Sequence, residues 1–375
     1  MGNTGSSNHY PLSSPNFAPQ YEILKKIYSH HYGDVKVIKE HRIGEEMILK
    51  DIVVNTEEAY NNEIRFLDHR VSKTHPNHVR IYGYTSQDKQ NFCSTYYKIS
   101  VFVESFNKDL ETELSERKEA TKYYSEGELL LLAYHLISGL AFFQEEQRTH
   151  GDVRPFNIFV TNDQTYKLSD PHLHPNKADA LANAIIGNAK TLLAPELIGQ
   201  VAVQDFEIRC DRIKADVYSL GATLLWAASL TNAEDFYDYE NGTINNEQLN
   251  QTLEGLSQRY STFTVDLIRD MLSKDPSIRP DFIALSNRLL PYRESILNKV
   301  TLSFYKVPVQ VPIAVETRQP TQPEEPKREN VIITELPKEI TTDNVEVEKK
   351  NAYVPYTSSY TSTYTPSTQN YTAPT

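Results

Sequence analysis

Two short polar stretches near the middle of the chain carry residue types that could transfer a phosphoryl group. An aspartate, Asp152, is followed two residues later by the cation Arg154 and five residues later by Asn157, and Asp170 follows on a further turn. Phosphoryl transfer needs a carboxylate facing the attacking hydroxyl, a cation near the transferring phosphate and oxygen ligands for Mg²⁺. The spacing therefore predicts one cleft with all four groups, although each aspartate alone could equally be a buried cap or turn residue.

The two stretches resemble the catalytic loop and the metal-binding turn of the eukaryotic protein kinases, whose patterns are His-Arg-Asp-x-Lys-x-x-Asn and Asp-Phe-Gly. Further motifs of that family follow in the same order, namely Ala194-Pro195-Glu196, Asp216-Val217-Tyr218-Ser219-Leu220-Gly221 and Asp275-Pro276-Ser277-Ile278-Arg279-Pro280. The resemblance covers residues 21–297. It implies a two-lobed α+β fold, with a small β-rich lobe over residues 21–106 and a larger helical lobe over residues 107–297.

ATP and Mg²⁺ are the cofactors that this resemblance implies. Lys50, in Met47-Ile48-Leu49-Lys50, would contact the inner phosphates, and Glu63 on the next helix would hold it, with Glu58 as the less favoured partner. Asn157 and Asp170 would hold the metal, and Asp152 would orient the substrate hydroxyl or accept its proton. The residues that would surround the nucleotide are Gly33, Val35, Ile48, Lys50, Val103, Glu104 and Phe106.

The chain departs from the family pattern at two turns. Tyr28 and His30 stand where the first two glycines of the phosphate-covering loop are expected, and the Asp-Phe-Gly turn reads Asp170-Pro171-His172. Side chains in place of glycine keep the backbone away from a phosphate, and proline fixes φ, so we expect a stiff turn. The apolar stack between the lobes is expected to use His150, Leu67 and Pro171.

Two functions therefore stay open from the sequence. The first is a divergent kinase that phosphorylates Ser and Thr of a protein substrate, since a cation two residues after Asp152 resembles the Ser/Thr kinases. The second is a pseudokinase, a kinase-fold scaffold or regulatory binding module with little or no catalysis.

Activation-loop phosphorylation is not expected to be the switch of this protein. Gly151 replaces the family's arginine that receives the phosphate, which adds a charge of about −1.5 to −2. Between Pro171 and Leu193 the only hydroxyl side chain is that of Thr191.

The elements that must position these residues can be read from periodicity and caps. Short β-like runs at residues 21–27, 35–38 and 47–54 predict the small sheet. Ser125 and Glu128 form a capping box that opens a buried helix over residues 129–143. The family resemblance implies, in addition, a buried central helix over residues 214–226. The acidic, Asn-rich insert at residues 231–254 is either a docking segment or a solvated loop.

Composition limits the partners and the compartment. A net charge of −12 argues against a nucleic-acid binder, because no stripe of Lys and Arg is present to neutralise phosphates. Two cysteines cannot provide a disulfide framework for a chain of 375 residues, which favours a reducing, cytoplasmic setting. The expected partner is a protein substrate. The oligomeric state is not readable.

Both ends of the chain are expected to be flexible, at residues 1–20 and in the Pro/Thr/Tyr-rich tail at residues 298–375. Gly2 and Ser6 match the N-myristoylation pattern, and a chance match in a disordered segment is the equal alternative. A single acyl chain would give only weak, reversible membrane association.

Overall fold

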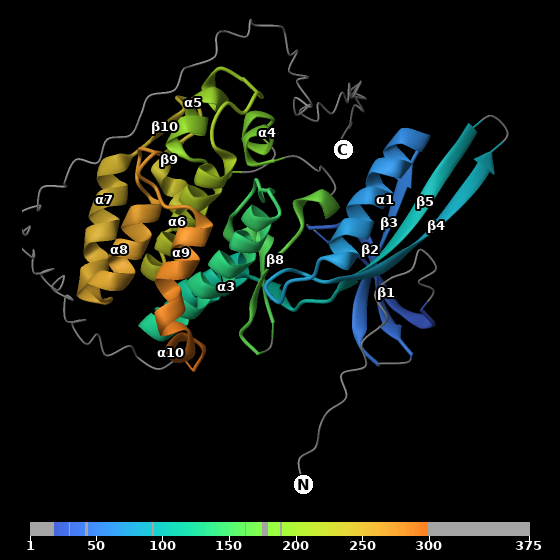
Figure 1. The fold of residues 1–375 in the computed structure, drawn as a ribbon, viewed down its shortest axis with the longest axis horizontal. Coiled ribbons are helices and arrows are strands. Elements are labelled where there is room, and N and C mark those ends of the chain that lie inside the picture. The colour runs from blue at the N-terminus through green and yellow to red at the C-terminus, as the bar shows by residue number, and fades with distance from the viewer. Residues whose placement is uncertain are drawn as a thin grey trace, which may run out of the picture. The chain divides into compact units, whose positions relative to one another are not determined.

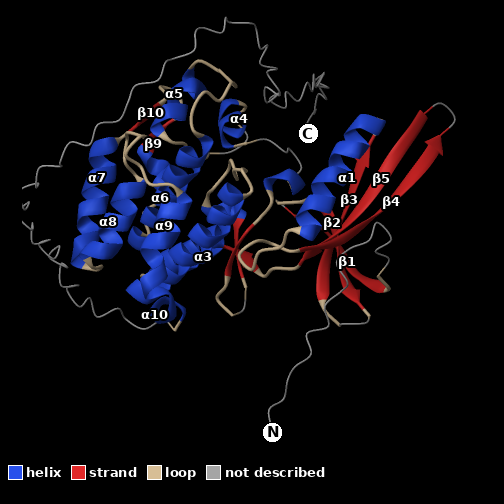
Figure 2. Ribbon diagram, viewed as in Figure 1, coloured by secondary structure: helices blue, strands red, loops and turns tan. Residues whose placement is uncertain are grey.

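The computed structural model describes residues 19–29, 31–41, 44–91, 94–161, 163–174, 179–187 and 190–298. Gly2, His30 and the predicted tail from residue 299 onward lie outside these residues. The α+β fold predicted from the sequence is confirmed, because a β-rich small lobe precedes a helical large lobe (Figures 1 and 2).

The small lobe is a five-stranded antiparallel sheet in the order β1-β2-β3-β5-β4, with one helix, α1. Thr56 opens α1 by accepting the amide of Ala59. The elements of this lobe are β1 (Tyr21–Ser29), β2 (Gly33–Glu40), β3 (Glu46–Val54), α1 (Glu57–Ser72), β4 (Ile81–Asn91) and β5 (Ser94–Glu104). The strands predicted at residues 21–27, 35–38 and 47–54 fall within β1, β2 and β3.

The β1–β2 hairpin has a short turn that contains His31 and Tyr32. Gly33 then pairs with Ser29 and has a φ of 74°, which is readily adopted by glycine alone. This backbone conformation sets the direction in which the tip of the hairpin points, and both tip side chains that the structure describes are buried.

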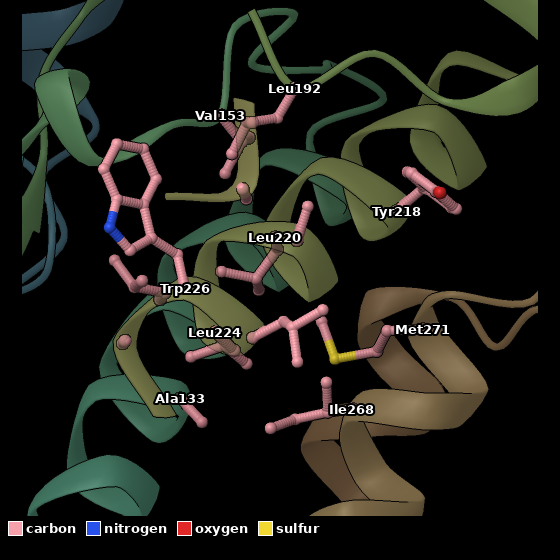
Figure 3. Close-up of a cluster of buried hydrophobic side chains, with 14 of the residues drawn as sticks. Ala133, Val153, Leu192, Tyr218, Leu220, Leu224, Trp226, Ile268 and Met271 are labelled. Atoms are coloured by element: carbon pink, nitrogen blue, oxygen red, sulfur yellow. The ribbon is translucent and has the colours of Figure 1, made fainter. Parts of the chain in front are cut away.

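The large lobe is mainly helical, and α6 (Arg212–Ser229), the predicted central helix, is largely buried and packs against several of the other helices (Figure 3). Leu220, Leu224 and Trp226 of α6 belong to the same buried cluster as Met271 of α8. A Cβ atom on Gly221 would lie 2.9 Å from Cβ of Met271, so α6 needs glycine there to approach its neighbour. The other helices are α2 (Leu110–Glu119), α3 (Glu126–Glu145), α4 (Ala180–Ile185), α5 (Pro195–Ala202), α7 (Asn246–Gly255), α8 (Thr262–Met271), α9 (Phe282–Leu289) and α10 (Arg293–Leu297).

Helix α3 carries the predicted capping box, since Ser125 accepts the amide of Glu128 and the Glu128 carboxylate accepts the amide of Ser125. By length and composition this helix could cross a membrane, but 67% of its most apolar window is buried inside the protein. Packing in the core therefore accounts for its apolar character.

Short elements between α3 and α6 present the catalytic stretches. A three-stranded sheet in the order β6-β7-β8 lies next to α2, and a 3₁₀ turn at Pro155–Asn157 leads directly into β7. Its strands are β6 (Lys108–Asp109), β7 (Ile158–Val160) and β8 (Tyr166–Leu168). Because β7 pairs with β8, Asn157 and Ser169 are neighbours: the Ser169 amide donates to the Asn157 carbonyl at 2.9 Å.

The insert at residues 231–254 is not a solvated loop, so that alternative is wrong. It contains a 3₁₀ turn at Ala233–Phe236, the hairpin β9 (Tyr237–Asp238) and β10 (Thr243–Ile244), and most of α7. Phe236, Leu249 and Leu253 are buried in the large-lobe core. The two leucines lie four residues apart, which gives α7 one apolar face to bury.

Candidate active site

The catalytic loop is tied to the central helix by a buried carboxylate. Asp216 of α6 accepts the amide of His150 at 2.7 Å and that of Gly151 at 3.0 Å. Burial raises the pKa of the Asp216 carboxyl to about 7, although both amides act to lower it. Gly151 has a φ of 81°, so glycine suits this position for backbone reasons as well.

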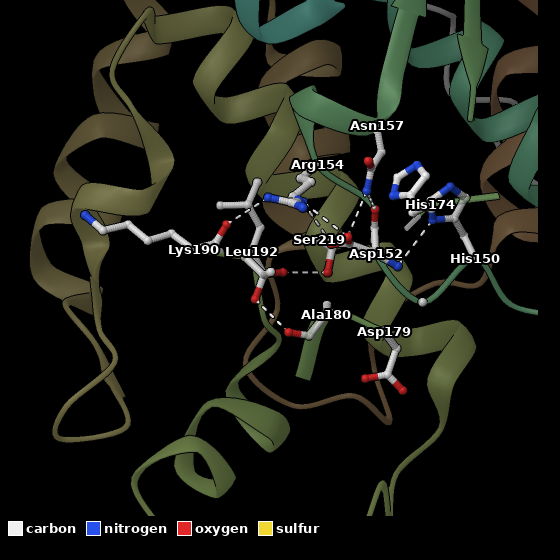
Figure 4. A network of polar contacts seen from close by, with 12 residues as sticks. His150, Asp152, Arg154, Asn157, His174, Asp179, Ala180, Lys190, Leu192 and Ser219 are labelled. Carbon is white, nitrogen blue, oxygen red and sulfur yellow. Dashed lines mark hydrogen bonds and ion pairs between the residues drawn. The ribbon is translucent and has the colours of Figure 1, made fainter. Parts of the chain in front are cut away.

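Asp152, Arg154 and Asn157 meet as the sequence predicted (Figure 4). Arg154 Nε lies 3.1 Å from Asp152 Oδ1, and Asn157 Nδ2 donates to Asp152 Oδ2 at 2.8 Å. Burial raises the pKa of the Asp152 carboxyl, and Arg154, His150 and Asn157 oppose that rise. Asn157 Oδ1 is buried and has no hydrogen-bond partner within the described part of the chain.

Lys50 and Glu63 are both buried on the small-lobe side of the cleft. Lys50 Nζ donates to the carbonyl oxygens of Tyr32 at 2.7 Å and Leu173 at 2.6 Å. Glu63 Oε2 lies 3.2 Å from His172 Nε2. The proposed pairing of Lys50 with Glu63 stays a prediction, while Glu58 is exposed at the start of α1 and does not lie in the cleft.

Asp170, the predicted metal ligand, has an arginine partner that the sequence did not suggest. Arg70 Nε, from α1, donates to Asp170 Oδ2 at 2.6 Å, and the amide of His172 donates to Asp170 Oδ1 at 3.1 Å. Burial acts to raise the pKa of Asp170, but Arg70, His172 and Arg148 outweigh it and leave that pKa below its usual value.

An aromatic cluster fills the space between the hinge, which is the segment with Phe106 that follows β5 and joins the two lobes, strand β7 of the large lobe and the tip of the β1–β2 hairpin. Phe106 of the hinge stacks on Phe159 of β7 with ring centroids 3.5 Å apart, and Tyr32 packs edge-on against both rings. The His31 ring lies 4.1 Å from that of Phe156 and hydrogen-bonds Asp109 at 3.2 Å. The members of this aromatic cluster are His31, Tyr32, Phe106, Phe156, Phe159 and His174.

The remaining predicted nucleotide contacts lie around this cluster. Val35 and Ile48 are buried in the same small-lobe cluster as Tyr32, with Ile48 paired opposite Val103. The Glu104 amide is already bonded to the Arg80 carbonyl at 2.9 Å, and its carboxylate accepts Lys167 Nζ at 2.5 Å. Gly33 is also buried, at the base of the hairpin turn.

The apolar stack between the lobes uses Leu173 in place of the predicted Pro171, so that expectation is wrong. Leu173 is fully buried in one cluster with Leu67, whereas Pro171 begins a 3₁₀ turn. His172 stacks on Phe66 of α1 at 3.8 Å. The proline starts the turn, and the turn then carries the leucine side chain inward two residues later.

The segment after the metal-binding turn rests against the catalytic loop. The amide of Ala180 donates to the Gly151 carbonyl at 2.9 Å, and Arg154 Nη1 donates to the Lys190 carbonyl at 3.3 Å. Thr191 is fully buried and its hydroxyl donates to the Ala180 carbonyl (Figure 4). A buried hydroxyl is not accessible for modification, which supports the expectation that its phosphorylation is not a switch.

The donor types fit a hard cation, but the cleft in this conformation does not fit a nucleotide. Carboxylate and amide oxygens are ligands that Mg²⁺ accepts, and buried Asn157 Oδ1 has no partner within the described residues. However, both oxygens of Asp170 are engaged, and aromatic rings occupy the space beside the hinge. No group of three or more His, Cys, Asp or Glu that could hold a metal occurs among the described residues.

Sequence reasoning missed Tyr32, Arg70 and Phe159. Tyr32 has no family motif to mark it, and Arg70 lies 100 residues from Asp170 in the chain. Phe159 is the middle residue of β7, a short apolar strand in which all three residues are buried, so its burial could have been predicted from the apolar run Ile158-Phe159-Val160.

The comparisons with known proteins agree on one family. The model described as "Protein kinase domain" matches residues 21–289. The chain is 29% identical over 280 residues to "Protein kinase wis1" of Schizosaccharomyces pombe, which covers 72% of this chain and 44% of that protein. It is 24% identical over 314 residues to "Wee1-like protein kinase 1-B" of Xenopus laevis, covering 73% and 47%. With "Serine/threonine-protein kinase Nek3" of Oryza sativa it shares 29% over 165 residues, covering 44% and 26%. The chain thus spans less than half the length of these relatives.

Proposed function

Since the chain belongs to the protein kinase family, we propose that it transfers a phosphoryl group from ATP, with Mg²⁺, to Ser and Thr hydroxyls of a protein substrate. One observation carries this proposal. Lys50 comes from a strand of the small lobe, whereas Asp152, Asn157 and Asp170 come from one stretch of the large lobe, and all four lie buried at the junction of the two lobes. A chain without a use for these four polar groups would not need to bury them together, because burial of polar groups costs free energy.

In the proposed reaction each polar residue has one task. Asp152 orients the substrate hydroxyl and takes its proton, which its raised pKa favours. Arg154 contacts Asp152 and keeps a positive charge beside the reacting groups. Asn157 and Asp170 would hold the metal, and Lys50 would hold the inner phosphates. When bound, ATP would supply the phosphoryl group, and Mg²⁺ would neutralise negative charge on the phosphates.

The proposal requires the cleft to open from the conformation described above. Tyr32 and Phe106 occupy the space beside the hinge, and Lys50 is bonded to two main-chain carbonyls. Buried Tyr32 Oη has no hydrogen-bond partner within the described residues, and an unpaired buried hydroxyl costs about 1–3 kcal/mol. The closed cleft thus leaves the Tyr32 hydroxyl without a hydrogen bond within the described residues, which supports opening of the cleft.

The same filled cleft favours a second candidate function, a kinase-fold binding module without catalysis. In that case the aromatic cluster and the Arg70–Asp170 pair are the permanent interior of the cleft, and the surface recruits a partner. The two functions make opposite predictions for nucleotide binding.

A thermal-shift measurement on the full chain distinguishes them. For the enzyme we expect the melting temperature to rise with Mg²⁺-ATP at about 1 mM, which RT ln(1 + [L]/Kd) makes measurable for a micromolar Kd. The rise should need Mg²⁺ and vanish in Asp170→Asn. Phosphate transfer to a Ser/Thr peptide mixture should then be lost in Asp152→Ala. No shift at millimolar nucleotide would leave the binding module as the function.

A further inference from the structure

The buried ion pair between α1 and the metal-binding turn is the most unusual feature of the cleft. Arg70 and Asp170 side chains are only 3% and 6% exposed, and Arg70 Nε lies 2.6 Å from Asp170 Oδ2. A charge-assisted contact of this length is at the short end for an N–H donor and a carboxylate. The pair adds a charged contact between α1 and the turn, which also meet where His172 contacts Glu63 and stacks on Phe66.

Arg70 is held in place by more than the carboxylate. Its Nη1 donates to the Lys73 carbonyl at 3.2 Å, and its guanidinium lies 5.8 Å from the centre of the Phe143 ring. The other oxygen of Asp170 accepts the His172 amide. Arg148 lies near the same carboxyl, because its charge also lowers the pKa of Asp170. Asp170 is therefore neutralised by the protein itself.

The chemistry of the guanidinium makes the positive charge of this pair independent of pH. An arginine stays protonated in proteins, so its charge is always available to Asp170. Removing one partner of a buried pair leaves an uncompensated charge, which is strongly unfavourable. A divalent cation that approached Asp170 would have to compete with Arg70 for the same oxygen.

We propose that Arg70 is the resident counter-cation of Asp170 and sets the metal affinity of the cleft, so that a divalent cation binds there only by displacing Arg70. The place given to the metal at Asp170 rests on the proposed function, whereas the ion pair does not. Asn157 Oδ1, buried and without a partner in the described residues, is the second oxygen that a displacing cation would use. Arg70 thus acts on metal affinity through Asp170 and does not touch the substrate.

The test measures Mn²⁺ binding to the full chain without nucleotide, from the electron paramagnetic resonance signal of free Mn²⁺. The main variant is Arg70→Met, which removes the charge but keeps an apolar stem against Phe143. The matched control is Arg65→Met, because Arg65 is an exposed arginine of the same helix. A double variant, Arg70→Met with Asp170→Asn, removes both charges.

We expect Arg70→Met to bind Mn²⁺ about tenfold more tightly than the wild type, since an unpaired buried carboxylate attracts a cation. Arg65→Met should match the wild type, and the double variant should lose the gain. Should Arg70→Met fail to fold, Arg70→Gln, which keeps a neutral donor for Asp170, is held to the same criterion.

Three results would overturn the proposal: equal affinity in the wild type and the Arg70 variant, a gain that survives Asp170→Asn, or micromolar Mn²⁺ binding by the wild type without nucleotide. None of these readouts depends on catalysis. A gain in Mn²⁺ affinity in Arg70→Met, together with no phosphate transfer by the wild type, would uphold the role of Arg70 and reject the proposed enzyme.

Discussion

At the scale of single residues, the cleft separates two carboxyl groups by their surroundings. Asp152 is buried with its pKa raised, whereas the cations around Asp170 outweigh its burial and lower its pKa. Opposite shifts of two neighbouring acids commonly separate a proton acceptor from a group that stays ionised. The directions agree with the tasks proposed for the two residues, with Asp152 as the base and Asp170 as the permanently charged ligand.

His174 should make the stability of the protein depend on pH. Burial, followed by the charges of His31, His150 and Arg154, lowers the pKa of His174 from 6.5 to about 3. The folded state then binds fewer protons than the unfolded state between these values. Stability from His174 is present above pH 6.5 and is lost as the pH falls toward 3, by about 2 kcal/mol at pH 5.

The measurement is the free energy of unfolding by urea at pH 7 and pH 5, for the wild type and His174→Phe. Phenylalanine keeps an aromatic ring in the cluster and removes the titration. Asp152 and Asp216 have raised pKa values and oppose this trend, so the informative quantity is the difference between the two proteins. An equal loss in both between pH 7 and pH 5 would rule out His174 as the cause.

At the scale of elements, the tip of the β1–β2 hairpin packs into the cleft. Its tip reaches the large lobe through the hydrogen bond of His31 to Asp109 and through the packing of Tyr32 on Phe106 and Phe159. Apparent ligand affinity falls in proportion to the fraction of molecules in which the site is open. A hairpin tip that fills the cleft should therefore weaken nucleotide binding.

Replacing Tyr32 with alanine should strengthen binding of a fluorescent ATP analogue to the full chain by about tenfold, because it favours the open state. Tyr32 is 1% exposed, whereas Tyr28 on the same hairpin is 66% exposed, so Tyr28→Ala is the control. Loss of a buried aromatic ring can cost about 3–5 kcal/mol, so circular dichroism must show that the variant is folded. A folded Tyr32→Ala with unchanged or weaker binding would show that the hairpin does not restrict access.

At the scale of the whole molecule, a buried ion pair joins the first turn of α5 to the segment between α8 and α9. Arg279 is 1% exposed and forms two contacts with Glu196, at 2.8 and 3.1 Å. Its remaining donors reach the carbonyls of Lys214 and Ser273. Glu196 and Arg279 belong to two of the family motifs found in the sequence, although they lie 83 residues apart.

Arg279→Met should lower the free energy of unfolding by about 3–5 kcal/mol, because it leaves the Glu196 carboxylate without its buried partner. The control is Arg288→Met, since Arg288 pairs with Asp270 on the exposed surface at 2.6 Å, and exposed pairs contribute about 0–1 kcal/mol. Urea unfolding of both variants checks this. Similar losses in the two variants would mean that burial of the Arg279 pair is not what stabilises the lobe.

The sequence by itself determined the family, the order of the elements and which residues of the two polar stretches would lie in the cleft. These follow from local patterns: the capping box of Ser125 and Glu128, the spacing of Asp152 and Asn157, and the ordered motifs through Arg279. Each pattern lies within about ten residues, where side-chain periodicity and turn chemistry fix the local geometry.

Only the tertiary structure decided what fills the cleft. Arg70 meets Asp170, Tyr32 meets Phe159 and Leu173 takes the place expected for Pro171, and no local pattern connects these partners. The physical reason is that contacts between lobes depend on how α1, the hairpin and the turn after Asp170 pack against one another. Such packing is selected by volume and charge in three dimensions, and residues distant in the chain become partners only after the chain has folded.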